Sequence, residues 1–297
     1  MYWNRLSDRL KETYGGKVYK LSLSSGCSCP NRDGTLGTRG CIFCDGAGAF
    51  AESGPIPAQL AAARRRVAAK AGSDPRFIAY FQSFTNTYAP AERLRELYTA
   101  AMAPEDVVAL SVATRPDCLP PEVLDLLAEL NHIKPVWVEL GLQTIHPQSA
   151  AYIRRGYDLP VYDRAVGQLK AAGITVVVHQ ILGLPGETEA MMAATARYIG
   201  ASGADGVKFH LLHVLRGTDL AAEWEAGRFA CLDLEAYIAA LEACLRNIPR
   251  EVVVHRLTGD GAKRDLLAPL WSGDKKRVLN AIRRAFARDD LEQGSAL

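Results

Sequence analysis

The feature that most constrains the fold is a repeated alternation between short apolar runs and amphipathic helical patterns in the first two thirds of the chain. β-Branched and aromatic residues dominate the short runs, whereas the longer segments place apolar residues three or four positions apart. Strands that alternate with helices predict right-handed crossovers and a parallel sheet. The predicted strands are Lys17–Ser24, Arg76–Gln82, Val107–Thr114, Val136–Gly141, Thr175–Ile181 and Gly206–His213. The predicted helices are Pro57–Ala71, Ala91–Met102, Pro120–Leu130, Val161–Ala171 and Glu187–Ala201.

Polar residues follow the predicted strands at the points where the strands end, as at Gln82–Thr87, Thr114–Asp117 and Glu139–Thr144. A barrel-type site is assembled from the carboxyl ends of several successive strands, whereas a doubly wound sheet gathers its site at one switch point. Six strand–helix units are fewer than the eight of a closed barrel. We therefore expect an α/β fold, a partial (β/α)6 TIM-type barrel.

The alternation breaks after His213, and the remainder is expected to form a C-terminal α/β extension packed on the barrel. The predicted organisation is an N-terminal segment at 1–16, the partial barrel at 17–215 and the extension at 216–297. Within the extension we predict helices at Asp219–Ala226, Leu232–Asn247 and Asp274–Arg288, and a strand at Glu251–Thr258.

Composition narrows the class of protein. The chain has 297 residues, 48% of them hydrophobic, which suits a globular protein with a sizeable core. Its formal charge of +2 is too small to indicate, by itself, binding to nucleic acid or to a membrane. Seven unevenly spaced cysteines without a secretory leader argue against disulfides and favour a cytoplasmic location. No apolar run reaches the ~20 residues that span a bilayer.

A glycine-rich loop after the first strand carries Cys27, Cys29, Cys41 and Cys44. Thiolates gathered this closely select zinc, copper or an iron–sulfur cluster. Four thiolates would close a structural zinc site, although Cys27-Ser-Cys29 is tighter than the usual Cys-x-x-Cys pair. Three would leave one iron of a cubane cluster open to another molecule. The spacing alone leaves both alternatives open.

Several motifs together resemble the radical S-adenosylmethionine (radical SAM) superfamily. They are Cys-Pro-Asn-Arg-Asp-Gly at Cys29–Gly34, Phe-Gln-Ser-Phe-Thr-Asn-Thr-Tyr at Phe81–Tyr88, Thr-Arg-Pro-Asp at Thr114–Asp117 and Arg-Leu-Thr-Gly-Asp at Arg256–Asp260. Within the superfamily, the combination resembles a bacterial family related to the catalytic subunit of Elongator and to anaerobic coproporphyrinogen oxidase. The resemblance implies a [4Fe–4S] cluster and S-adenosylmethionine as cofactors, and a 5′-deoxyadenosyl radical as the reactive species.

The resemblance also implies which residues hold the cofactors. Cys29, Cys41 and Cys44 map to the cluster ligands, leaving Cys27 as a spare thiol beside them. Glu139 would accept the ribose hydroxyls, with Gln143 a weaker candidate, and Arg155 would pair with the methionine carboxylate. The Gly-Gly-Glu motif that often holds the methionine amino group is missing here. The other expected cofactor contacts are Phe43, Gln82, Ser83, Thr85, Asn86, Gln180, Gly183 and Pro185.

The substrate is less constrained. Lys208 and His210 are candidates for the substrate pocket, while the catalytic residues are not identified. Two basic clusters, at Arg64–Arg66 and along Lys275–Arg288, form either solvated helix faces or a surface for RNA phosphates.

Elongator-type relatives modify carbon 5 of the wobble uridine of transfer RNA. The resemblance therefore implies a tRNA substrate, with conversion of carboxymethylaminomethyluridine to aminomethyluridine, and a reductant such as flavodoxin or ferredoxin. The alternatives are a radical SAM enzyme acting on a small metabolite such as a tetrapyrrole, and a zinc-stabilised RNA-binding protein that is not an enzyme.

Overall fold

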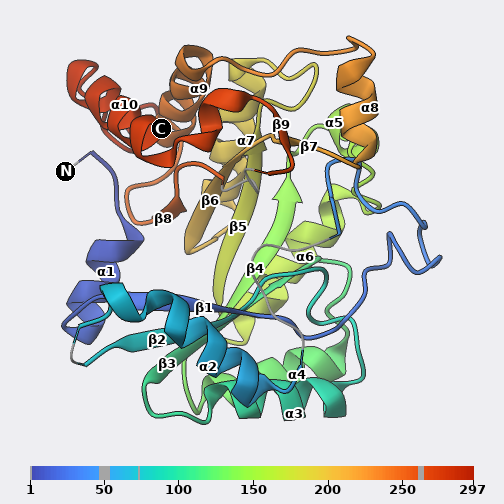
Figure 1. The fold of residues 1–297 in the computed structure, drawn as a ribbon, viewed down its shortest axis with the longest axis vertical. Helices are drawn as coiled ribbons and strands as arrows, with labels where there is room; N and C mark the ends of the chain where they lie inside the picture. Colours follow the sequence, from blue (N-terminus) through green and yellow to red (C-terminus); the bar gives the residue numbers. More distant parts are fainter. Residues whose placement is uncertain (1, 47–53, 73, 260–263) are drawn as a thin grey trace.

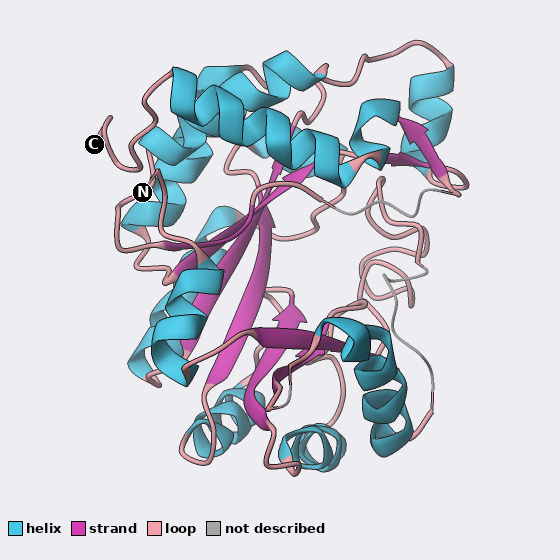
Figure 2. Cartoon of the chain, turned by 60° about the vertical axis from the view of Figure 1, so that its left-hand side comes forward, coloured by secondary structure: helices cyan, strands magenta, loops and turns pink. Residues whose placement is uncertain are grey.

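A computed structural model of the chain describes residues 2–46, 54–72, 74–259 and 264–297. Its centre is one curled sheet in which seven parallel strands follow the order β1-β2-β3-β4-β5-β6-β8 (Figures 1 and 2). The strands are β1 (Val18–Leu23), β2 (Arg76–Phe81), β3 (Val107–Thr114), β4 (Val136–Gln143), β5 (Thr175–Leu182), β6 (Gly206–Leu211) and β8 (Val253–Arg256). The predicted partial barrel is confirmed.

Helices cover the outer, convex face of the sheet (Figure 2). Each turns an apolar stripe toward the strands, as in α3, where Leu94, Tyr98, Ala101 and Met102 are buried. The helices between consecutive strands of the barrel are α2 (Ile56–Val67), α3 (Ala91–Met102), α4 (Pro121–Asn131), α5 (Pro147–Tyr152), α6 (Leu159–Ala171) and α7 (Glu189–Ala201). A short 3-10 turn, Ala68–Lys70, follows α2. The main apolar core lies between these helices and the sheet.

The C-terminal extension completes the barrel sheet as well as packing on it. Its strand β8 pairs in parallel with β6 and becomes the seventh strand, one more than the six-unit prediction. The extension also contains α8 (Asp219–Glu225), α9 (Leu234–Arg246) and α10 (Lys275–Arg288), and its strand β9 (Leu266–Ala268) pairs antiparallel with β7 (Val214–Leu215).

The barrel stays open between its edge strands, β1 and β8. An N-terminal helix that was not predicted, α1 (Leu6–Tyr14), lies at this opening, and Arg5 forms a parallel bridge with Val254 of β8. The helix packs against both edge strands. We call this gap the seam. In the described part of the chain, no helix combines the length and the apolar character needed to cross a bilayer.

Candidate functional site

Three of the four loop cysteines line one cavity at the carboxyl ends of the strands. Cys29, Cys41 and Cys44 lie around a space of about 250 Å³ that β3, β4 and β5 also help to enclose. The loop is held by its own backbone, since Gly40 N–H donates to Asn31 O (2.7 Å) and Cys44 N–H donates to Cys41 O (3.0 Å). The three thiols therefore share one side of a preformed pocket.

Cys27 points elsewhere. Its side chain is 6% exposed and belongs to the apolar core under α3, apart from the cavity that the other three thiols line. Burial raises the pKa of the Cys27 thiol, while a hydrogen bond with Ser25 and the charge of Arg93 oppose that rise. Cys27 thus packs as a small apolar side chain, which supports the prediction that it is a spare thiol.

Arg32 lies at the centre of the cysteine loop. Its guanidinium donates to Cys44 O (2.7 Å) and is close enough to all three thiols that their charges help to raise its pKa, against the lowering effect of burial. A Cβ atom on Gly40 or Gly46 would come within about 3 Å of this guanidinium. Both positions have positive φ and neither leaves space for a side chain.

The donor set fits a polynuclear cluster better than a single ion. Among the described residues, no three His, Cys, Asp or Glu side chains converge as the ligands of one metal ion would. Three soft thiols around a cavity are nevertheless the ligand type that an iron–sulfur cluster requires. Burial raises the pKa of Cys41 to about 11, so that cluster binding must displace its proton.

Six predicted cofactor contacts line the same cavity. The sheet contributes Gln82 after β2, and Glu139 and Gln143 on β4. Gln143 has a φ of 69° and sits where the register between β4 and β5 shifts, a bulge that re-aims its side chain. The others are Phe43, Thr85 and Arg155.

Five other predicted contacts lie outside this set. The Gln180 amide donates to Met192 O (2.7 Å) on the helix side of the sheet, and the Asn86 amide donates to Phe81 O (3.1 Å) and Ala113 O (2.8 Å). A Cβ on Gly183 would meet Leu232. These residues shape the fold near the cavity. Ser83 and Pro185 are likewise not among the residues that line it.

A substitution of Asn86 can distinguish a structural role from direct contact with S-adenosylmethionine. Its amide is fully buried and also accepts from Ser25 Oγ (2.7 Å), so Asn86→Ala leaves buried partners unpaired. We expect the free energy of unfolding to fall by about 2–4 kcal/mol, while S-adenosylmethionine binds the folded protein with unchanged affinity. Chemical denaturation and equilibrium dialysis measure the two effects. Gln82→Ala is the matched control, expected to weaken binding with little loss of stability. Weaker binding by Asn86→Ala with unchanged stability would show that Asn86 contacts the cofactor directly.

Several cavity residues were not predicted as site residues, above all Arg115 and Tyr157. The Tyr157 ring lies under two guanidiniums, 4.6 Å from Arg155 and 5.3 Å from Arg115. Asp117 accepts two hydrogen bonds from Arg115 (2.8 and 2.9 Å). Backbone oxygens fix Arg155, which donates to Thr144 O (2.6 Å) and Tyr157 O (3.0 Å). Arg115 belongs to the Thr-Arg-Pro-Asp motif, which was the sequence signal that could have identified it. Phe84, Thr114 and His179 also line the cavity.

A buried polar layer lies across the inside of the barrel, with one side chain from each strand between β1 and β6. Its centre is Glu139, which is fully buried. Lys20 Nζ (2.6 Å) and Ser111 Oγ (2.7 Å) donate to Oε1 of Glu139. Tyr80 (3.0 Å), His179 (2.8 Å) and Lys208 contact Oε2. Interior layers of such barrels are usually apolar, so this layer requires a specific reason.

The polar layer changes the argument for Glu139. Five protein groups already satisfy this buried carboxylate, so its burial does not require a ribose diol as a partner. The ribose contact stays a prediction. Lys208, proposed for the substrate pocket, belongs to the same layer. His210 lies next to it, with its ring 4.9 Å from the ring of His179.

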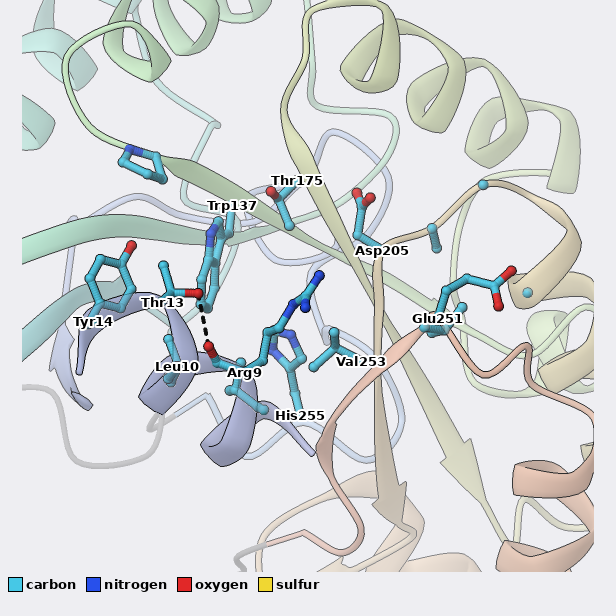
Figure 3. A pocket seen from close by; sticks show the side chains of 16 residues that line it. Arg9, Leu10, Thr13, Tyr14, Trp137, Thr175, Asp205, Glu251, Val253 and His255 are labelled. Carbon is cyan, nitrogen blue, oxygen red and sulfur yellow. Dashed lines mark hydrogen bonds between the residues drawn. The ribbon is translucent and has the colours of Figure 1, made fainter. Parts of the chain in front are cut away.

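A second cavity, of about 530 Å³, lies at the opposite end of the strands (Figure 3). Thr175, Asp205 and Val253 line it where β5, β6 and β8 begin, together with Trp137 and His255. Asp205 is already paired with Lys170 (2.5 Å). The amino ends of barrel strands serve stability more than chemistry. The smaller cavity with the cysteines is therefore the better candidate site.

Comparisons with known proteins agree with this geometry. Residues 34–199 match the model described as "Radical SAM superfamily", and residues 204–288 match the Radical_SAM C-terminal domain. The chain is 42% identical to the uncharacterized protein YtqA of Bacillus subtilis, covering 98% of this chain and 92% of YtqA. It is 39% identical to the protein YhcC of Escherichia coli, covering 99% of this chain and 95% of YhcC.

More distant relatives match part of the chain or its fold. A tRNA uridine(34) acetyltransferase of Methanocaldococcus infernus is 28% identical over 52% of this chain and 29% of its own length. The solved structure of Elp3 from the same archaeon superposes with a TM-score of 0.70 at 18% identity, covering 93% of this chain and 64% of that one. This likeness shows the shared fold. The chain therefore belongs to the radical SAM superfamily, and it is an enzyme whose cofactors are a [4Fe–4S] cluster and S-adenosylmethionine.

Proposed function

We propose that this enzyme modifies the wobble uridine of tRNA and converts carboxymethylaminomethyluridine to aminomethyluridine. The observation that carries the proposal is the sequence similarity to a tRNA uridine(34) acetyltransferase across half of the chain. Only 29% of that relative is matched, so acetyl transfer is no part of the proposal. Family membership argues against the zinc-stabilised binding protein considered from the sequence.

The cavity has residues suited to each part of this reaction. Cys29, Cys41 and Cys44 would hold the cluster, and Arg155 would orient the methionine carboxylate through its guanidinium. Phe43, Gln82, Thr85 and Gln143 would contact the rest of S-adenosylmethionine. When bound, these cofactors would supply a radical that takes a hydrogen atom from the carboxymethyl CH2 group. Loss of one further electron, returned to the oxidised cluster, would leave an imine, which water would cleave to the aminomethyl product and glyoxylate. A one-electron donor such as flavodoxin or ferredoxin would complete the system.

The polar layer suits a substrate that carries a carboxylate. Lys20 and Lys208 share one acidic partner, Glu139, so their donors outnumber the acids that contact them in this layer. The layer adjoins the cavity through Glu139 and His179, which belong to both. A carboxymethyl group entering the barrel from the cavity would meet these lysines.

Anaerobic incubation with dithionite, S-adenosylmethionine and bulk tRNA, followed by nucleoside mass spectrometry, tests the proposal. We expect carboxymethylaminomethyluridine to decline while aminomethyluridine and 5′-deoxyadenosine accumulate together. Protein carrying Cys41→Ala is the control and should leave the nucleosides unchanged. Unchanged nucleosides in cells that lack the gene would contradict the proposal and favour a small-metabolite substrate.

A further inference from the structure

A groove of about 450 Å³ lies along the seam, between α1, the edge strands and α10. Figure 1 shows α1 and α10 on either side of β8. Four basic side chains line the groove, Arg5, Arg256, Lys275 and Arg283, and the described residues that line it include no Asp or Glu. Arg5 is partly neutralised by Asp8 (2.7 Å), and Arg256 and Lys275 also have interaction partners of their own. Arg283 is exposed on α10.

The groove adjoins a strong concentration of charge. Helix α10 carries six basic residues and no acidic one, while the rest of the chain has 29 basic and 33 acidic residues, a formal charge of −4. A positive stripe on an otherwise acidic protein attracts polyanions. The six residues are Lys275, Lys276, Arg277, Arg283, Arg284 and Arg288.

The apolar face of α10 is not available to a lipid. Val278, Ile282 and Phe286 are buried in the core, with Phe286 packed edge-on against Trp3 (5.2 Å). A membrane-surface helix instead inserts its apolar face between the lipid headgroups. The exposed part of α10 is therefore cationic and hydrophilic, which suits phosphates in water.

The groove also leads toward the interior of the barrel. Arg256, at the end of β8, lines the groove and pairs in register with Lys208 of the polar layer. His255 lines both the groove and the cavity at the amino ends of the strands. A chain held along the seam would thus lie beside β1 and β8, the two edge strands of the sheet in the described part of the protein.

We propose that the seam groove binds the phosphodiester backbone of the RNA substrate, with Arg283 as its main phosphate contact. The proposal rests on the tRNA function given above and adds the surface and the direction of approach. Phosphate contacts fix the position of an RNA without reading its sequence. The groove is therefore expected to bind different tRNAs with similar affinity, and the cavity would select the nucleotide.

The test compares two exposed arginines on two different helices. Arg283→Glu removes a groove contact, and Arg65→Glu on α2 makes the same charge change outside the groove. A labelled tRNA transcript is titrated with each full-length protein at several salt concentrations. We expect Arg283→Glu to weaken binding about tenfold and to reduce the salt slope by about one. Arg65→Glu should stay within about twofold of the unaltered protein.

Three outcomes would contradict the proposal that the groove binds tRNA. Equal losses for Arg65→Glu and Arg283→Glu would show a diffuse charge effect. Normal tRNA binding by Arg283→Glu, with tRNA still modified, would refute the groove and leave the proposed function intact. Binding of the unaltered protein to anionic phosphatidylserine vesicles but not to tRNA would refute both. Unchanged thermal melting of the variants shows that the fold is retained.

Discussion

Replacing any one of Cys29, Cys41 and Cys44 with alanine is expected to abolish cluster binding, whereas Cys27→Ala should retain it. The first three thiols line one cavity, and the fourth is packed into the apolar core. A cubane held by three ligands loses a third of its protein attachment with each substitution. Iron and sulfide per chain after anaerobic reconstitution, with the visible absorption of the cluster, measure the outcome.

The Cys27 variant needs a stability control, because its side chain is buried. Removing the buried sulfur should cost about 1–2 kcal/mol and lower the melting temperature without changing iron content. Cys27→Ser should cost more, since a hydroxyl is costlier to bury than a thiol, even with Ser25 as a hydrogen-bond partner. Folded Cys27→Ala protein that lacks iron would show that this thiol is a ligand. An iron content unaffected by Cys41→Ala would show that Cys41 is not a ligand and would also contradict the three-ligand assignment.

Local pattern was sufficient to predict most of the barrel. Helix α3 and strand β3 begin and end at the predicted residues, because long apolar periodicity and proline at the helix start are local signals. β8 was predicted as a strand of the extension, but its place in the barrel sheet depends on its pairing with β6 across the intervening helices α8 and α9. Local sequence contains no such information. Helix α1 was missed, since only Leu10 of its nine residues is buried.

The site also has one part that local sequence could predict and one part that it could not. The cysteines proposed as cluster ligands lie close together in the sequence, and their spacing with the flanking motif was enough to propose them. The polar layer is different, because Lys20, Ser111 and Lys208 come from three strands and each is an ordinary residue in its own segment. Only the curl of the sheet brings them to one carboxylate. The role expected for Glu139 was therefore inferred without its actual neighbours.

Glu139→Gln is expected to be strongly destabilising. It leaves Lys208, 6% exposed, beside an amide that offers one acceptor oxygen in place of a shared carboxylate. Removing one partner of a buried ion pair costs about 3–5 kcal/mol, because the other charge remains without compensation. Urea unfolding should show this loss. Adding Lys208→Met should recover part of it, since the second substitution removes the stranded charge. A loss below about 1 kcal/mol would contradict a central role for the carboxylate in the layer.

The same carboxylate should make stability depend on pH. Burial alone would raise the pKa of Glu139, but the charges of Lys20 and Lys208 and the hydrogen bond from His179 together hold it well below its ordinary value of 4.5. A folded pKa below the unfolded one stabilises the protein above about pH 4.5, and this contribution is lost as pH falls through the folded pKa. Between pH 5 and pH 3, the free energy of unfolding should therefore fall less steeply for Glu139→Gln than for the unaltered protein. Parallel slopes would show that Glu139 has no depressed pKa, and the ion pairs at the centre of the layer would then be electrostatically unimportant.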